Sequence, residues 1–186
     1  MKTYQNLMKE IYNNGIYVPS RTGVSTYKLF GTRMEFDMSE GFPLLTTQKV
    51  FFKGVVEELL WFLSGSTNIN DLNKRGVKFW DSWANESGSL GPMYGEQFRL
   101  WRTSENKSID QISELLANLI SKPFSRRHVV SSWNPEFLPN ESISPQENVN
   151  AGKIALAPCH GIFQCDITPI SSMMRNEMYN KGKPID

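Results

Sequence analysis

Two segments of the chain repeat their apolar residues at helical spacing and are followed by residues that end helices. Residues 4–14 place apolar side chains on one side of a helix, and Gly15 follows. Residues 110–120 show the same repeat, with Asp110 near the start, where a carboxylate is favoured. Pro123 stops this second segment. We predict a helix in each.

A third helix is predicted at about 53–64. At about 100° per residue its apolar side chains cover an arc of about 160°, so we expect a broad buried face. Thr46 or Thr47 would cap its start. Glu58 lies about 40° from Phe62, at the rim of this face. Two interpretations of Glu58 stay open, a solvated edge residue or a partly buried carboxylate with a raised pKa that suits general acid–base catalysis.

Other segments have the short apolar runs of strands. Residues 26–36 carry apolar side chains on both faces, which predicts a strand buried on both sides. Residues 128–133, 154–157 and 162–170 also have strand character. Residues 135–152 hold three prolines and no strong periodicity, so we predict a surface loop.

Aromatic residues and turn formers dominate residues 66–101. Trp80 and Trp83 would share one side of a helical turn. A pair of stacked indoles is either part of the core or a flat wall for a planar ligand, and the sequence leaves both open.

The composition is that of one globular domain. The 186 residues are 39% hydrophobic with a net charge of +1, so the charge does not indicate general binding to nucleic acid or membranes. No run reaches the roughly 18 apolar residues of a membrane span. Cys159 and Cys165 would lie about 20 Å apart on one strand, too far for a disulfide, and a reducing, cytoplasmic compartment follows. The Cys and His residues lack the spacing of a zinc site, so no metal is expected.

Cys159 follows Pro158 between two strand-like runs, where a proline favours a defined bend. A thiol there is either a buried structural cysteine or a nucleophile. A cysteine hydrolase would need a histidine base. His160 is a poor candidate because neighbours on a strand point to opposite faces, and His128 would have to approach from a separate strand.

Arginines fit the chemistry of this thiol better than histidine does. Arg126 and Arg127 stand at the head of a predicted strand, and Arg21 lies in a polar loop. Guanidinium groups suit bidentate contacts to phosphate. A nucleophilic cysteine, a glutamate and several arginines together indicate conjugate addition to a phosphorylated heterocycle rather than peptide cleavage.

The chain resembles the thymidylate synthases from about residue 2 to about residue 167. Eight sequence blocks in the family's order carry the resemblance: Ser20-Arg21-Thr22-Gly23, Gly41-Phe42-Pro43-Leu44-Leu45-Thr46-Thr47, Glu58-Leu59-Leu60-Trp61-Phe62-Leu63, Trp80-Asp81-Ser82-Trp83, Leu90-Gly91-Pro92-Met93-Tyr94-Gly95, Asp110-Gln111-Ile112, Ser125-Arg126-Arg127 and Ala157-Pro158-Cys159-His160.

The resemblance implies an α+β fold in one domain, residues 1–186. A mixed β-sheet would be covered by helices on one face and would pack in a homodimer by the other. The implied activity is that of a methyltransferase in nucleotide biosynthesis. It converts dUMP to dTMP with 5,10-methylenetetrahydrofolate as carbon donor and reductant, and yields dihydrofolate.

The resemblance also assigns roles to individual residues. Cys159 would add to C6 of the uracil. The other catalytic residues would be Glu58, which assists proton transfers, and Tyr94, which lies near the thiol. The nucleotide phosphate would be held by Arg21, and by Arg126 and Arg127 entering from the partner subunit. The folate side would be formed by Trp80, Trp83 and Asp81.

Members of the family continue well beyond residue 186, so the resemblance implies an incomplete catalytic domain: a fragment, a truncated reading frame or one piece of a split protein. The residue that separates uracil from cytosine lies in the missing part. Two alternatives therefore accompany the thymidylate synthase hypothesis. One is a deoxypyrimidine monophosphate hydroxymethylase, which adds water instead of hydride, although Trp80 favours the methylating enzyme because that indole shields the intermediate from water. The other is an inactive fragment that needs a complementing chain, and we expect little turnover from this chain alone.

Overall fold

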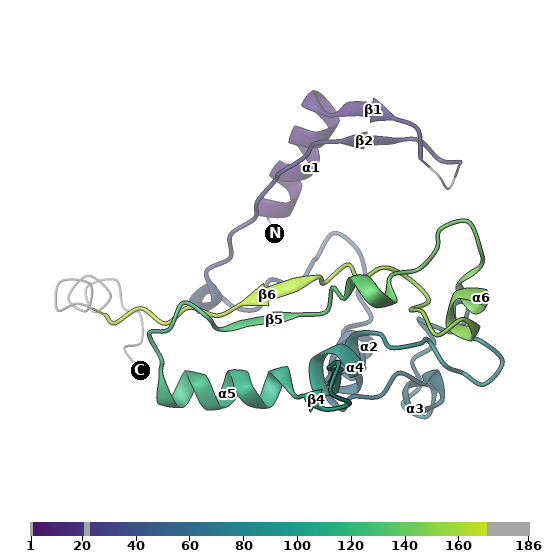
Figure 1. Cartoon of the computed structure of the whole chain (residues 1–186). Helices are drawn as coiled ribbons and strands as arrows, with labels where there is room; N and C mark the ends of the chain where they lie inside the picture. Colours follow the sequence, from purple (N-terminus) through teal and green to yellow (C-terminus); the bar gives the residue numbers. More distant parts are fainter. Residues whose placement is uncertain (1, 21–22, 171–186) are drawn as a thin grey trace. The chain divides into compact units, whose positions relative to one another are not determined.

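The computed structural model describes residues 2–20 and 23–170 (Figure 1). Within this part the chain forms two compact units, one in residues 2–51 and one in residues 52–170. Arg21 and the polar segment from residue 171 to the end lie outside the described residues, so the phosphate role expected of Arg21 is not placed.

The first unit begins with the predicted amphipathic helix. Helix α1 spans Lys2–Asn14, and the Gly15 amide donates to the carbonyl of Ile11 at 2.8 Å, which confirms the helix and its stop. Strand β1 (Ile16–Val18) then pairs antiparallel with β2 (Thr26–Lys28). A short 3-10 helix, Met38–Glu40, follows.

The long strand predicted at 26–36 is wrong in length and in burial. Strand β2 ends at Lys28, and the Phe30 side chain is 96% exposed. Gly31 follows with φ of 77°, a left-handed conformation that interrupts extended backbone. Thr26, Tyr27 and Lys28 are all exposed, so neither face of β2 is buried within the described residues.

The second unit contains five helices and four strands among its described residues. The helices are α2 (Phe52–Leu63), α3 (Ile69–Asn73), α4 (Tyr94–Arg99), α5 (Gln111–Ser121) and α6 (Pro145–Asn150), with a 3-10 turn at Pro135–Phe137. The strands are β3 (Trp101–Arg102), β4 (Ser108–Ile109), β5 (Val129–Ser131) and β6 (Ile162–Gln164). The mixed helix and strand content confirms the α+β class.

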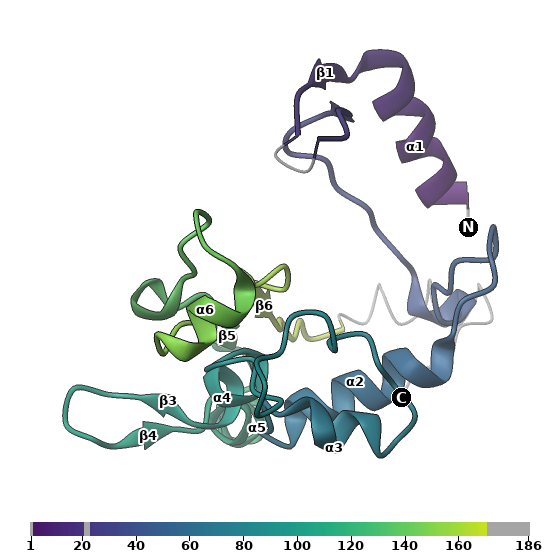
Figure 2. The same cartoon turned by 90° about the vertical axis from the view of Figure 1, so that its right-hand side faces the viewer.

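The described strands pair as three separate two-stranded antiparallel sheets. The hairpin β3–β4 projects from the end of α4 (Figure 2). Helix α5 lies alongside the pair β5–β6, in which Val130 stands opposite Phe163 (Figure 1). The single mixed sheet expected from the resemblance is therefore not formed within residues 2–20 and 23–170.

The hydrophobic core of the second unit gathers around the C-terminal end of α2. Its buried members are Trp61, Phe62, Leu72, Val77, Leu90, Met93, Tyr94, Phe98, Leu115, Val130, Val149, Ile154 and Ala155. Burial of an aromatic or aliphatic side chain of this size contributes about 1.5–3 kcal/mol each.

Helix α2 confirms the third predicted helix, but its broad apolar face is only partly buried. Val55, Val56, Leu59 and Leu60 are exposed, although all four were expected to face the core. Periodicity identifies which residues share a face, whereas burial depends on whether another element packs against it. The helix also begins at Phe52, several residues after Thr46 and Thr47, so the prediction that one of them caps it is wrong.

Helix α5 has the acidic start that its sequence predicts. The Asp110 side chain accepts from the Ser113 amide at 2.9 Å and pairs with Arg99 at 2.8 Å. Partial burial acts to raise the pKa of Asp110, but the hydrogen bonds from Ser113 and the Arg99 charge outweigh it and hold this pKa below its ordinary value.

We expect Asp110→Ala to lower the free energy of unfolding by about 1–2 kcal/mol, because the N-cap is lost. Asp110→Asn retains an acceptor for the Ser113 amide and should cost less. Because the folded-state pKa of Asp110 is depressed, its charge stabilises the fold above about pH 4, and this contribution is lost as pH falls through the folded-state value. Thermal melts should therefore show the gap between native chain and Asp110→Asn narrowing below pH 4. A gap that stays constant from pH 3 to pH 7 would contradict this account.

The surface loop predicted at 135–152 contains two short helical segments, Pro135–Phe137 and α6 (Pro145–Asn150), with loop between and after them. Ser144 and Glu147 form a capping box at the start of α6, and Asn148 and Val149 are buried. The Ser-x-x-Glu spacing that marks such a helix start is present in the sequence, but the prolines and asparagines around it favoured a loop. Proline at the first helical position is compatible with a helix, because its missing N–H would have no partner there.

The strand predicted at 154–157 is absent, although Ile154 and Ala155 are buried. The Ile154 amide donates to Phe137 O and the Ala155 amide to Leu90 O, each at 3.0 Å, so loops rather than a strand take these hydrogen bonds. Gly91, with φ of 73°, lies against the Lys153 carbonyl, where a Cβ would clash. Close packing of these two loops positions the segment that leads to Cys159.

Candidate active site

A cavity of about 470 Å³ contains the cysteine that the sequence singled out. Its walls come from α2, α4, β6 and the bend before β6, and most of them are apolar. The lining residues are Val55, Glu58, Leu59, Phe62, Tyr94, Phe98, Cys159, His160, Ile162 and Phe163. This volume suits a ligand of small-molecule size, for which pockets of roughly 300–1,000 Å³ are usual. The three predicted catalytic residues Cys159, Glu58 and Tyr94 thus lie around one cavity.

Tyr94 holds the backbone that carries the thiol. Its hydroxyl oxygen accepts from the Cys159 amide at 2.7 Å and from the His160 amide at 3.3 Å. Tyr94 itself is fixed at the start of α4, with its ring 4.5 Å from that of Phe62. Gly95 allows this end of α4 to approach the Ser66 carbonyl, where a Cβ would clash. Cys159 remains exposed and unpaired.

The environment of Tyr94 keeps its phenol protonated. Burial is the largest effect and raises the pKa of Tyr94, and negative charge on Cys159 or Glu58 raises it further. The two backbone N–H donors act in the opposite direction without overcoming the burial. The phenol oxygen accepts hydrogen bonds from both N–H groups, so these contacts do not use its own proton. That proton is available for donation to a group in the cavity.

Glu58 is oriented by a tryptophan rather than by a basic residue. The Trp80 indole N–H donates to Glu58 Oε1 at 2.7 Å, and both residues are half-buried. The buried residues of α2 are Gly54, Trp61 and Phe62, so Glu58 lies on the buried side of the helix between them and not at its rim, and of the two interpretations left open the partly buried one fits. An indole can only donate, so this contact holds one carboxylate oxygen in place and leaves the other for a ligand or water.

The two indoles do not form a flat wall. Trp80 and Trp83 meet edge to face, at 66° with ring centroids 6.0 Å apart, and both pack against the core. Neither lines the Cys159 cavity; Trp80 reaches it through Glu58, and Trp83 supports Trp80. Asp81 is exposed in the same turn.

His160 lies on the same side of the chain as the thiol, contrary to the argument that neighbours would point to opposite faces. Both Cys159 and His160 line the cavity, because residues 159 and 160 form a bend and not a strand. The His160 ring packs at 5.7 Å from the Tyr94 ring. No hydrogen bond between this imidazole and the thiol occurs in the described structure, so the site has the thiol, carboxylate and phenol as its facing groups.

The two arginines of the 125–127 segment do not reach the cavity of their own chain. Arg126 and Arg127 are exposed, and neither lines the cavity around Cys159. Arg127 instead lines a separate cavity of about 320 Å³ between α5, β5 and the β3–β4 hairpin. The structure therefore does not place either arginine beside Cys159 of its own chain.

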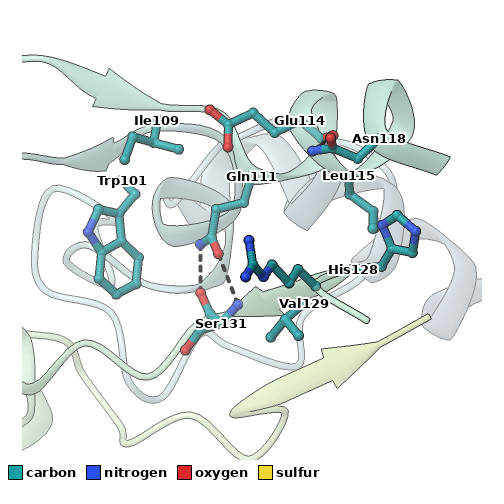
Figure 3. A pocket seen from close by; sticks show the side chains of 10 residues that line it. Trp101, Ile109, Gln111, Glu114, Leu115, Asn118, His128, Val129 and Ser131 are labelled. Atoms are coloured by element: carbon teal, nitrogen blue, oxygen red, sulfur yellow. Dashed lines mark hydrogen bonds between the residues drawn. The ribbon is translucent and has the colours of Figure 1, made fainter. Parts of the chain in front are cut away.

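His128 lines the same separate cavity as Arg127 (Figure 3). The His128 side chain is 1% exposed, and its Nε2 lies 3.1 Å from the Pro123 carbonyl. A carbonyl can only accept, so Nε2 carries the proton. In the same view the Gln111 amide bonds both the N–H and the carbonyl of Ser131, at 3.0 and 2.7 Å. His128 is thus a core residue here and not a base for Cys159.

Sequence reasoning overlooked the buried polar residues that support the site. Gln97 donates to Pro92 O at 2.7 Å and accepts from Asn134 at 3.1 Å, with both side chains buried. Ser132 donates to His160 O at 2.6 Å. Of these residues only Ser132 falls in a predicted strand, 128–133, where a polar side chain between apolar neighbours was the available indication, since buried polar groups are nearly always hydrogen-bonded.

No group of three or more His, Cys, Asp or Glu side chains that could hold a metal ion is found in residues 2–20 and 23–170. Over the same ranges, no helix combines the length and apolar character that crossing a bilayer requires.

The fold and the cavity define an α+β protein with an accessible thiol facing a carboxylate and a protonated phenol. The family model described as thymidylate synthase matches residues 2–182. A curated thymidylate synthase of Francisella philomiragia subsp. philomiragia is 51% identical over 164 residues, which cover 88% of this chain and 59% of that protein. The chain therefore belongs to the thymidylate synthase family and spans about 59% of the length of this relative.

Proposed function

We propose that the protein of which these residues form part is a thymidylate synthase. It transfers a one-carbon unit to C5 of dUMP and reduces it to the methyl group of dTMP, with 5,10-methylenetetrahydrofolate as cosubstrate and dihydrofolate as product. The proposal rests on family membership together with one observation, namely that Cys159, Glu58 and Tyr94 line the same cavity. Residues 1–186 belong to one catalytic domain under this proposal.

Cys159 is the nucleophile. Its thiolate adds to C6 of the uracil ring, and this addition makes C5 electron-rich enough to attack the one-carbon unit. The thiol is exposed in the cavity while its backbone amide is held by Tyr94 at 2.7 Å, so the attacking atom stands on a fixed loop. Fixed placement of the reacting atom is a large part of what a site contributes to rate.

Glu58 and Tyr94 serve the proton transfers. Glu58 lines the same cavity as the thiol, and its carboxylate is oriented by the Trp80 indole at 2.7 Å. The phenol of Tyr94 keeps its proton because burial raises its pKa. A carboxylate that can accept a proton and a phenol that can donate one suit the exchange of protons at C5 and at the uracil oxygen.

The folate supplies the one-carbon unit and the reducing hydride when it is bound. Apolar walls from Leu59, Phe62 and Phe163 and a volume of about 470 Å³ fit planar rings stacked beside the thiol. Trp80, Trp83 and Asp81 do not line this cavity, and we propose that they form the folate side of the site beyond Glu58, where the Trp80 indole keeps water away from the C5 substituent. Exclusion of water favours reduction to a methyl group over hydration to a hydroxymethyl group.

The active form is a homodimer. Arg126 and Arg127 are exposed and do not line the cavity of their own chain, so in this proposal they enter the partner's site and bind the nucleotide phosphate. Arg21 binds the same phosphate within its own chain. The exposed apolar residues of α2 and β6 supply surface that assembly would cover. Two free cysteines fit a reducing, cytoplasmic compartment.

The test is covalent trapping with 5-fluoro-2′-deoxyuridylate and methylenetetrahydrofolate. The fluorine blocks loss of the C5 proton, so the adduct should persist, and peptide mass spectrometry should find it on Cys159. A deoxypyrimidine monophosphate hydroxymethylase would form the same adduct, so the products formed from dUMP and from dCMP must also be identified. An adduct on Cys165, or a hydroxymethyl product, would overturn the proposal.

A further inference from the structure

The loop that carries Cys159 is held from two sides. On one side the Tyr94 oxygen accepts the amides of Cys159 and His160, at 2.7 and 3.3 Å. On the other side the Ser132 hydroxyl donates to the His160 carbonyl at 2.6 Å. The Ser132 amide also donates to the Gly161 carbonyl at 2.9 Å. Both backbone polar groups of His160 are therefore bonded, one by each side.

The Ser132 hydroxyl makes one short hydrogen bond, to the His160 carbonyl, and its contact to the Gly161 carbonyl is longer, at 3.4 Å. Its side chain is 1% exposed, directly after β5, where the chain turns its polar groups toward the bend at 159–161. A buried hydroxyl needs a partner, since leaving it unpaired is costly. The His160 carbonyl can only accept, which fixes the direction of the bond. A distance of 2.6 Å lies at the short end for an O–H···O hydrogen bond.

We propose that Ser132 is a positioning residue for the nucleophile. It fixes the His160 carbonyl and thereby the orientation of the peptide plane that follows His160. Tyr94 fixes the peptide planes on either side of Cys159 through the two amides. Pro158 restricts the chain just before them. Loss of the Ser132 hydroxyl frees the carbonyl side of this loop while Tyr94 still holds the amide side. The catalytic role of Ser132 rests on the proposed function. The hydrogen bonds that hold the loop do not depend on it.

The test compares the native chain with Ser132→Ala, Ser132→Thr and Ser131→Ala. Threonine keeps the hydroxyl and suits extended backbone. Ser131 is the matched control, because its hydroxyl makes no contact with His160: it accepts from the Trp133 amide at 3.2 Å and lies 3.4 Å from Gly161 O and 3.5 Å from Trp133 O. The first measurement is amide hydrogen exchange at Cys159 and His160, followed by NMR.

Ser132→Ala is expected to speed exchange at the Cys159 and His160 amides about fivefold, the factor that corresponds to one hydrogen bond of about 1 kcal/mol. Ser132→Thr and Ser131→Ala should stay within about twofold of the native chain, as should the Val130 amide in every variant. Equal rates in Ser132→Ala and Ser131→Ala would overturn the inference. So would a uniform rise across β5, which would make Ser132 a general stabiliser.

The second measurement is the kinetics of trapping with 5-fluoro-2′-deoxyuridylate. Ser132→Ala should lower the limiting rate of adduct formation at least threefold and change the half-saturating nucleotide concentration less than twofold, with threonine restoring the rate. The opposite split would show that Ser132 acts on binding and would overturn the positioning role. The trapping is measured on the protein of which these residues form part, so absence of an adduct in all variants, the native protein included, contradicts the proposed function instead, and the exchange rates then decide the role of Ser132 alone.

Discussion

Cys159→Ala is expected to abolish covalent trapping by 5-fluoro-2′-deoxyuridylate and to lower turnover of dUMP by at least about 10³-fold. The thiolate forms the bond on which every later step depends, and no other side chain of the cavity is a comparable nucleophile. Dihydrofolate formation followed by absorbance measures turnover, and mass spectrometry measures the adduct.

Cys165→Ala is the matched control for this substitution. Cys165 is also a free thiol, but it packs against the core and does not line the cavity. Its substitution should leave both the adduct and turnover within about twofold of the native protein, apart from any change in thermal stability. An adduct that persists in Cys159→Ala and disappears in Cys165→Ala would reverse the assignment.

Glu58→Gln is expected to lower kcat by about 10²–10⁴-fold, the usual contribution of a positioned general acid–base group. Glutamine has the same shape and can still accept the Trp80 N–H through its oxygen, so α2 and the orientation of the side chain should survive. What is lost is the capacity to take up and release a proton. Trapping by the fluorinated nucleotide should therefore be impaired less than turnover.

Glu57→Gln separates catalysis from the general effect of removing a charge on α2. Glu57 neighbours Glu58 in sequence but bonds Arg75 at 3.0 Å and lies outside the cavity. An exposed ion pair of this kind contributes about 0–1 kcal/mol to stability, so kcat should change little. If both substitutions lowered kcat equally, Glu58 would have no special role in proton transfer.

The helices show how far local pattern determines structure. Helices α1, α2 and α5 begin and end within about two residues of the ranges predicted from apolar spacing, because the spacing, Gly15 and Asp110 act locally. Helix α6 was overlooked although its capping box is present, since the prolines around it were taken as loop formers.

The strands and the burial of faces were predicted less well. Strand β2 is shorter than predicted, no strand forms at 154–157, and much of the apolar face of α2 is exposed. Each of these depends on a partner element, and a sequence pattern does not say which element that is. The expectation that His160 points away from the thiol was wrong because residues 159 and 160 form a bend in place of the expected strand.

For this chain the sequence by itself determined the helical segments, the α+β class and, through its resemblance to the thymidylate synthases, the residues Cys159, Glu58 and Tyr94. Only the tertiary structure decided that these three surround one cavity, that Trp80 orients Glu58, and that Ser132 and Tyr94 hold the loop of the thiol from two sides. Spacing and caps act between near neighbours along the chain, whereas these contacts join α2, α4, β5 and the bend before β6. Such contacts form only when packing brings distant segments together.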